Sequence, residues 1–202
     1  MSALEILGFS IGTAFASGLN LYATVAILGL MQRFHFVELP SSLSALSHPA
    51  VLIVAIGLYA VEFVADKVPY VDTIWDAIHT FIRPPAAALL AYAAIGDVPE
   101  AWRLIGGLLA GGVALTSHGT KASARAAINA SPEPFSNWVA SLSEDGIALF
   151  LTWMAAKHPV LTFVIVLALL VLSIYLLVRF ARFLKQVINR FVLRSGDGVA
   201  PR

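Results

Sequence analysis

The sequence contains no cysteine and few charged residues. Without cysteine the chain has no disulfide framework, no thiolate metal site and no thiol nucleophile. Only 12% of its 202 residues are charged, whereas soluble domains carry about 25%. This low fraction, with a mean hydropathy of +0.84, excludes an ordinary cytosolic domain and a disordered chain. The formal net charge of +1 argues against a nucleic-acid binder.

What the sequence has instead is apolar residues, which make up 59% of the chain. At about 20 residues per spanning helix, the length holds at most about six or seven membrane spans with short loops. The apolar runs do not alternate as the strands of a transmembrane barrel do. These features predict an all-α, polytopic transmembrane helical bundle of about six spans, surrounded by membrane lipids.

The apolar runs differ in length. The runs 6–31 and 159–178 are long enough to cross a bilayer. Four runs between them have 11 to 13 residues: 49–61, 84–95, 104–115 and 146–156. At 1.5 Å per residue, each covers less than about 20 Å of a hydrocarbon core about 30 Å thick. They are either short re-entrant segments or parts of longer helices whose polar residues face protein or water.

The basic residues indicate an orientation. On a six-span scheme with the N-terminus inside, Arg33, Arg103 and Lys157 lie outside, and the other 10 of the 13 basic residues lie inside. This bias satisfies the positive-inside rule and predicts that both termini face the cytoplasm. Six of the ten follow residue 178, and we expect that basic stretch to lie against anionic lipid. The predicted units are one transmembrane domain, 1–185, and a basic cytoplasmic tail, 186–202.

Two weak internal similarities raise the question of duplication. Residues 16–20 resemble 117–121, and 46–50 resemble 142–146, at offsets of 101 and 96. With three spans in each copy, the second copy would be inverted, as in many transporters that bind substrate between their halves. Two interpretations stay open: an inverted repeat of 1–96 and 102–185, and chance similarity among small and apolar residues.

The first apolar run carries a polar helix face. Thr13, Ser17, Asn20 and Thr24 have relative spacings of 0, 4, 7 and 11, which places them on one side of a helix. Close helix packing explains the hydroxyl residues. Asn20 is different, because a buried amide needs hydrogen-bond partners.

A second polar face follows the fourth apolar run. His118, Lys121, Arg125 and Asn129 have spacings of 0, 3, 7 and 11. Two basic side chains facing lipid at the bilayer centre would cost about 5–7 kcal/mol. They therefore either face a polar interior, where they bind an anion or pair with carboxylates, or snorkel at the inner interface.

Carboxylates precede and follow this basic face. Glu62 and Asp66 lie one helical turn apart at the end of the second span. After a break at Pro69, an amphipathic interfacial helix at about 72–83 carries Asp72, Asp76, His79 and Arg83 on one face. That face is either solvated at the inner surface or part of a site.

Glu144 and Asp145 open the predicted fifth span, after a loop that begins at Ser131 and a short interfacial helix over 135–142. Carboxylates in a first helical turn suit the helix dipole and cap the helix. The alternative is that they act as ion ligands at the entrance of the span.

Three of these segments carry a family resemblance. Residues 18–24 (GLNLYAT), 62–85 (EFVADKVPYVDTIWDAIHTFIRPP) and 117–134 (SHGTKASARAAINASPEP) resemble the DUF4126 family of small bacterial integral membrane proteins, over about residues 5–185. The resemblance implies a bacterial cytoplasmic membrane and no known reaction. It implies no catalytic, cofactor-binding or metal-binding residues, so the candidate site rests on the polar faces alone.

Three functions remain in view. The first is a transporter or channel that moves an ion or small charged solute, with proton coupling and an anionic solute both open. Its expected path is lined by Asn20, Glu62, Asp66, His118, Lys121 and Arg125, supported by Asp72, Asp76, His79, Arg83, Asn129, Glu144 and Asp145. We favour this function, because ionisable residues inside a membrane mark ion and substrate pathways.

The second function is a structural or accessory subunit that docks a partner or anionic lipid. The third is a lipid-modifying enzyme with Asp76 and His79, or Glu62 and His118, as acid and base. The chain has neither an HExxH nor a GxSxG motif, which argues against that enzyme. We expect no cofactor and no metal, and self-association into a homo-oligomer stays open.

Overall fold

The computed structural model describes residues 1–96, 98–130 and 134–196. Within these ranges the chain is all-helical, without strands, which confirms the predicted fold class. The helices are α1 (Ala3–Leu19), α2 (Leu21–Arg33), the 3-10 helix η1 (Ser41–Ser47), α3 (Pro49–Ala65), α4 (Val71–His79), α5 (Arg83–Ala94), α6 (Glu100–Asn129), α7 (Pro134–Lys157) and α8 (Pro159–Gly196). The start of the predicted loop, 131–133, and the end of the predicted tail, 197–202, lie outside the described residues.

The six-span bundle is not confirmed. Among the described helices, only α8, over Pro159–Asn189, is by itself long and apolar enough to cross a membrane. A second crossing exists if η1 and α3, bent by 64°, count as one broken span. The other helices are shorter than a span or carry charged residues along part of their length.

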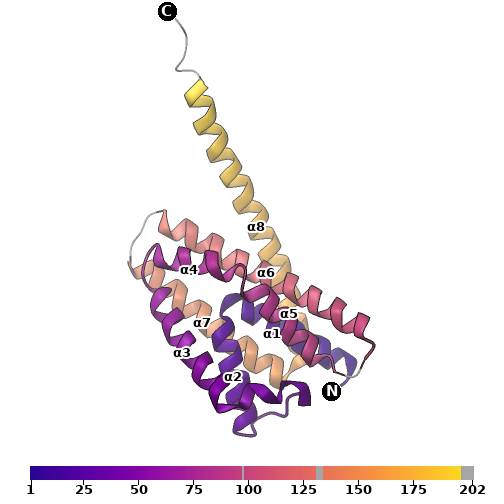
Figure 1. The fold of residues 1–202 in the computed structure, drawn as a ribbon. Helices are drawn as coiled ribbons and strands as arrows, with labels where there is room; N and C mark the ends of the chain where they lie inside the picture. Colours follow the sequence, from indigo (N-terminus) through magenta and orange to yellow (C-terminus); the bar gives the residue numbers. More distant parts are fainter. Residues whose placement is uncertain (97, 131–133, 197–202) are drawn as a thin grey trace, which may run out of the picture.

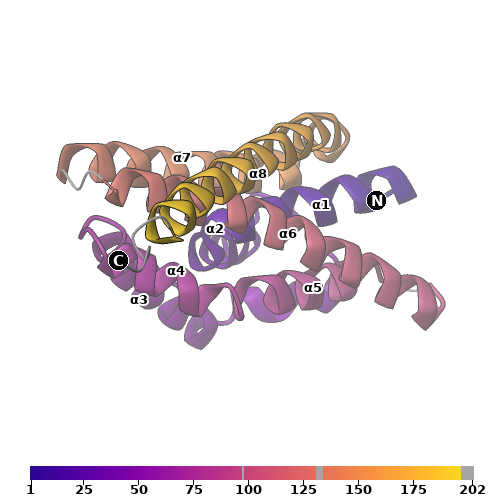
Figure 2. The ribbon, with the colours of Figure 1, turned by 90° about the horizontal axis from the view of Figure 1, so that it is seen from above.

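Asn20 divides the first apolar run into two helices. Its backbone is extended, with φ −150°, and its side-chain oxygen accepts a hydrogen bond of 2.9 Å from the backbone N–H of Ala23. An asparagine cap of this kind satisfies the free N–H groups at the start of α2. In Figure 2, α1 runs across the view whereas α2 is seen nearly end-on. The single helix expected over 6–31 is therefore two helices of different direction.

The start of the chain and the described end of α8 lie far apart in the molecule (Figure 1). Met1 lines the same hollow as Glu38 and Leu39, which follow α2, whereas the last turns of α8 project away from the body (Figure 1). If α8 is a span, its start at Pro159, against which Gly8 packs, and its described end lie on opposite sides of the membrane, which gives an alternative to the scheme with both termini in the cytoplasm.

Helix α4 has its polar face inside and its apolar face outside. Asp72, Asp76 and His79 are at most 2% exposed, whereas Ile74 and Ile78 are 64% and 52% exposed. The interpretation of α4 as a helix with a solvated polar face is therefore wrong.

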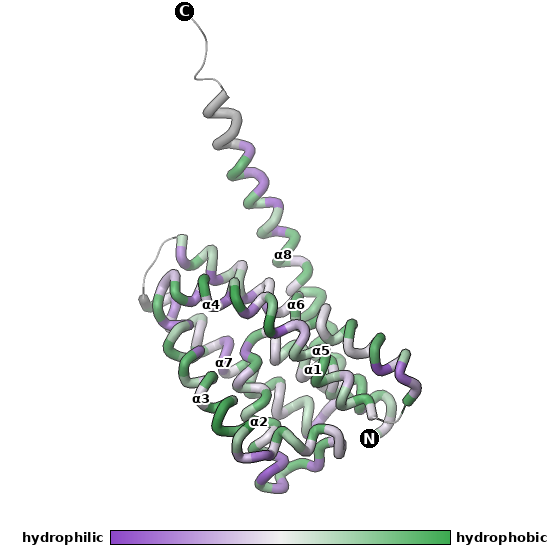
Figure 3. Tube along the Cα trace, viewed as in Figure 1, coloured by the Kyte–Doolittle hydropathy of each residue, from purple (hydrophilic) through white to green (hydrophobic). Residues whose placement is uncertain are grey.

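Helix α8 changes character along its length. Apolar residues predominate in the part of α8 beside the body, and polar residues become frequent along its projecting part (Figure 3).

Small residues bring α1 and α6 close together. A Cβ on Gly18 in α1 would overlap the side chain of Ser117 and the carbonyl of Ala114 in α6. The hydroxyl of Ser117 donates a hydrogen bond of 2.9 Å to the carbonyl of Phe15. Close approach of small residues is typical of helices packed in membranes. Here it places the end of α1 against the charged half of α6.

Candidate functional site

Charged side chains from five helices meet around the break between α1 and α2, and we call this set the buried ion network. Each member is less than 15% exposed. Its members are Glu62 and Asp66 at the end of α3, Asp72 and Asp76 in α4, Arg83 at the start of α5, Lys121 and Arg125 in α6, and Glu144 and Asp145 in α7. The charged faces predicted separately from the sequence therefore form one cluster.

Three short ion pairs form the frame of the network. Arg83 lies 2.7 Å from Glu62, Lys121 lies 2.6 Å from Asp66, and Arg125 lies 2.6 Å from Glu144. Lys121 also lies 3.7 Å from each of three further carboxylates, those of Glu62, Asp76 and Glu144. The Nζ of Lys121 is therefore the centre of the network.

The broken helix end takes part in the network. The carbonyl of Gly18 accepts a hydrogen bond of 3.0 Å from Arg83, and that of Leu19 accepts one of 3.3 Å from Lys121. These cations lie at the negative end of the α1 dipole, where they are stabilised. On the opposite side, the amide of Asn20 donates a hydrogen bond of 2.9 Å to Asp145. Asn20 thus joins the two helix ends to α7, which gives its buried amide the partners that it requires.

The contacts of His118 show that it is neutral. Its Nδ1 lies 2.9 Å from Nη1 of Arg83, and a guanidinium can only donate hydrogen bonds, so this Nδ1 accepts. Its Nε2 consequently holds the proton, which points to the carbonyl oxygen of Asp76 at 3.0 Å. The expected cationic face of α6 is therefore reduced to Lys121 and Arg125.

His79 connects α4 to α2. Its Nδ1 donates to the carbonyl of Trp75 at 2.8 Å, and its Nε2 lies 3.0 Å from the hydroxyl of Tyr22. His79 lies outside any membrane-spanning helix, because α4 has nine residues and is too short to span a bilayer. Burial lowers the pKa of His79 below the ordinary value, which favours the neutral ring.

Amides complete the network at the far end of α6. Asn129 donates to Asp72 at 2.8 Å, and Asn137 donates to Asn129 at 3.0 Å. The carbonyl of Asn137 accepts a bond of 3.2 Å from Arg125. Sequence reasoning missed Asn137, although Asn137, Ser141 and Asp145 are spaced four residues apart on α7, a face that periodicity could have revealed.

Acidic groups outnumber basic ones in the network. Six carboxylates face three permanent cations, and Lys67 lies only half-buried at the edge. Several buried carboxylate oxygens have no hydrogen-bond donor among the described residues: Oε2 of Glu62, Oδ1 of Asp66, Oδ2 of Asp72, both oxygens of Asp76 and Oδ2 of Asp145. The network is therefore formally negative and incompletely satisfied.

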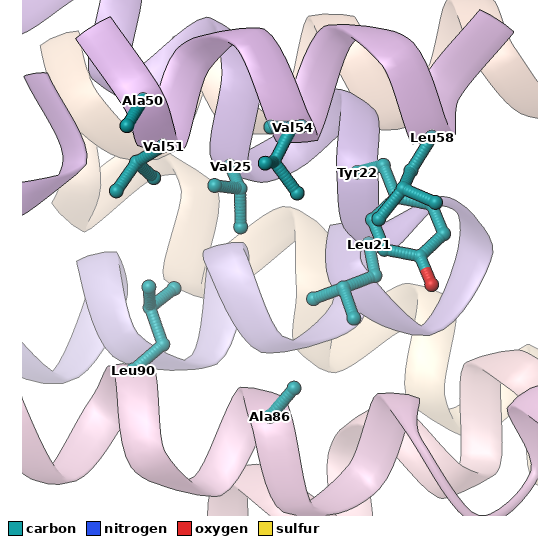
Figure 4. Close-up of a pocket in the computed structure, with 10 residues that line it drawn as sticks. Leu21, Tyr22, Val25, Ala50, Val51, Val54, Leu58, Ala86 and Leu90 are labelled. Carbon is teal, nitrogen blue, oxygen red and sulfur yellow. The ribbon is translucent and has the colours of Figure 1, made fainter. Parts of the chain in front are cut away.

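An apolar groove of about 450 Å³ lies beside the network, between α2, α3 and α5. Val25, Val54 and Leu90 are among its lining residues (Figure 4). Tyr22 also lines it, and its hydroxyl contacts His79. The groove therefore reaches His79 on the buried polar face of α4 through Tyr22.

The structure brings together every residue of the predicted path and its predicted support. The alternative of side chains snorkelling at an interface does not apply, because Lys121 and Arg125 are buried and paired. The capping interpretation of Glu144 and Asp145 is also wrong. They lie in the middle of α7, since the short helix and the span predicted on either side of Ser143 form one helix.

The predicted helix over 72–83 also differs from the structure. It ends at His79, and Arg83 instead begins α5. Within the described ranges, no group of three or more histidine, aspartate or glutamate side chains is arranged to hold a metal ion.

The fold and the site define an all-helical protein with a buried ion network at a helix break. The chain belongs to the DUF4126 family, described as a domain of unknown function, whose model matches residues 7–179. This confirms the resemblance seen in the sequence. No curated protein and no solved structure matches the chain.

Proposed function

We propose that the protein is a small integral membrane transporter or channel that moves an ion or small charged solute through the buried ion network. The observation that supports this proposal is the combination of an apolar exterior with charged side chains gathered at a broken helix. Ionisable residues inside a membrane are costly and mark ion and substrate pathways. Broken helices supply free carbonyls and helix ends to such pathways.

A cation or a proton fits this path better than an anion. Each of the three cations already has a carboxylate partner at 2.6–2.7 Å. The carboxylates are in excess, so an incoming anion would meet net repulsion. A cation or proton would instead relieve the negative charge.

Lys121 is the group that we expect to move during transport. It contacts four carboxylates from α3, α4 and α7, one at 2.6 Å and three at 3.7 Å. Its flexible stem allows it to exchange these partners with small displacements. Such an exchange frees one carboxylate at a time for the passing ion.

The proposed orientation keeps the projecting end of α8 in the cytoplasm. That end carries Arg179, Arg182 and Lys185, and the positive-inside rule places basic residues there. Because Met1 lies at the opposite end of the molecule, the N-terminus is then outside. The segment around Asn20 enters the membrane and returns.

Flux in proteoliposomes tests the proposal. Purified protein is reconstituted, and the uptake of protons, Na⁺ and K⁺ is followed with indicator dyes. We expect flux in the wild type, its loss in Asp66→Asn, and its retention in the exposed control Glu100→Gln. Absence of flux for all three cations, and for chloride and phosphate, would refute the proposal.

A second function, an accessory subunit, is favoured by one observation. The basic end of α8 projects from the body (Figure 1) and offers a charged surface to a partner or to anionic lipid. Purification from native membranes separates the two functions. A stoichiometric partner protein together with no flux would support the accessory role.

A further inference from the structure

The two carboxylates Glu62 and Asp76 share the same two cations. Oε1 of Glu62 lies 2.7 Å from Nη2 of Arg83, and Oδ1 of Asp76 lies 3.6 Å from that same nitrogen. Both oxygens lie 3.7 Å from Nζ of Lys121. Since the side chains are 0% and 2% exposed, both acids lie away from water beside the same Arg83 and Lys121, and we call them the carboxyl pair.

This pair lacks hydrogen-bond donors. Of its four oxygens, only Oε1 of Glu62 has one among the described residues, namely Arg83. Lys121 gives its short contact to Asp66 instead. Arg83 also donates to the carbonyl of Gly18 and to His118. Most hydrogen bonds of Arg83 and Lys121 therefore go to groups other than Glu62 and Asp76.

The groups around the pair do not supply the missing positive charge. His118 accepts from Arg83 and is neutral. The titratable and charged groups that face the pair are Tyr22 on α2, Tyr59 and Asp66 on α3, His79 on α4, Arg83 on α5, His118 and Lys121 on α6, and Glu144 on α7 through Lys121. Two of these are cations and two more are carboxylates.

We propose that Glu62 and Asp76 share one bound proton at neutral pH, and that this carboxyl pair is where the transported or coupling proton binds. Lys121 is shared with Asp66 and Glu144 as well, so ionising both acids is unfavourable, because each carboxylate disfavours the charge of the other. The proton bonds to one carboxylate and forms a neutral acid, whose O–H is then available to a neighbouring oxygen that has no donor. The inference that a proton is bound uses only this geometry. The inference that the proton moves rests on the proposed function.

Infrared spectroscopy of the full-length protein tests the shared proton. A protonated carboxyl group gives a C=O stretching band, which we expect at pH 7 in the wild type and which shifts in D₂O. Either Glu62→Gln or Asp76→Asn should remove the whole band, because the remaining acid then ionises beside Arg83 and Lys121. Glu62→Asp should keep the band, and so should the control Glu100→Gln.

Several outcomes overturn the shared proton. They are the absence of the band, its survival in both amide variants, and its loss in only one of them, which would assign the proton to a single acid. Circular dichroism and a monodisperse elution profile establish that each variant is folded. If both amide variants fail to fold, loss of the band in Glu62→Asp overturns the shared proton. Proton flux is measured separately. If the band is present and proton flux is absent, the shared proton is supported and its role in transport is refuted. If Na⁺ or K⁺ flux is present and the band is absent, the shared proton is refuted and the proposed function is retained.

Discussion

At the scale of single residues, the cost of burying charge explains most of the site. Arg83 is fully buried, and its guanidinium binds a carboxylate, a carbonyl and a histidine nitrogen. The i, i+4 spacing of Glu62 and Asp66 and the spacing on α6 were readable from the sequence. The pairing between α3 and α6 was not, because it depends on tertiary contacts between helices far apart in the chain.

Replacing Arg83 should destabilise the protein strongly. Arg83→Leu leaves Glu62 buried without its closest cation, which we expect to cost about 3–5 kcal/mol. Thermal unfolding in detergent measures this loss. The double variant Arg83→Leu/Glu62→Leu should recover part of it, and the exposed control Arg182→Leu should change little. An unaltered melting temperature in Arg83→Leu would contradict the role of the ion pair.

Gly18 should not tolerate a side chain. A Cβ there would collide with the backbone of Ala114 and the hydroxyl of Ser117, so Gly18→Ala should lower stability by about 1–3 kcal/mol. Gly112 on α6 is a matched control, since a Cβ there meets nothing within 4 Å. Equal melting temperatures for Gly18→Ala and Gly112→Ala would show that α1 and α6 are not packed closely at this point.

At the scale of the helices, the breaks position the site. The sequence predicted the polar faces of α4 and α6, because their periodicity is local. It did not predict the break at Asn20, since Asn20 lies within an apolar run and its side chain binds both Ala23 and Asp145, the latter from α7. Nor did it predict the continuity of α7 through Glu144, because a largely buried carboxylate needs a cation, and its partner Arg125 comes from α6.

Removing the cap at Asn20 should loosen the helix break. Asn20→Ala loses the bond to Ala23 and the donor to Asp145, and we expect a loss of about 1 kcal/mol for the cap alone. Asn20→Asp keeps the cap but adds a carboxylate beside Asp145, so it should be less stable than the wild type as well. Hydrogen exchange at the start of α2 reports the change, and unchanged protection there in Asn20→Ala would refute the capping role.

The contact between α4 and α2 should depend on pH through His79. Burial lowers the pKa of His79 in the folded protein, so protonation is easier in the unfolded chain. Its contribution to stability is therefore complete above about pH 6.5, the ordinary pKa of histidine, and is lost as the pH falls below that value. Melting temperatures from pH 8 to pH 5 should fall, and His79→Asn should reduce the slope. An equal slope in the variant would exclude His79 as the cause.

At the scale of the whole molecule, the proposed orientation can be tested directly, because the natural chain has no cysteine. We expect Glu38→Cys to react with a membrane-impermeant maleimide in intact cells, and Gln186→Cys to react only in inverted vesicles. Both residues are exposed; Glu38 lines the same hollow as Met1, and Gln186 lies on α8 beyond Arg182. Labelling of both from the same side would contradict an outside N-terminus and an inside C-terminus.

The arrangement of the charges also constrains how the protein is made. During synthesis the carboxylates of α3 and α4 leave the ribosome before Lys121 and Arg125, which lie on α6. Inserting an unpaired charged residue at the centre of a membrane costs about 2.5–3.5 kcal/mol. On the proposed membrane location, separate insertion of each helix is therefore unfavourable, and we expect the segments up to α6 to stay near the translocon until their partners arrive. Assembly of this small chain is thus expected to be a late, concerted event, and a chain truncated before α6 should be degraded instead of inserted.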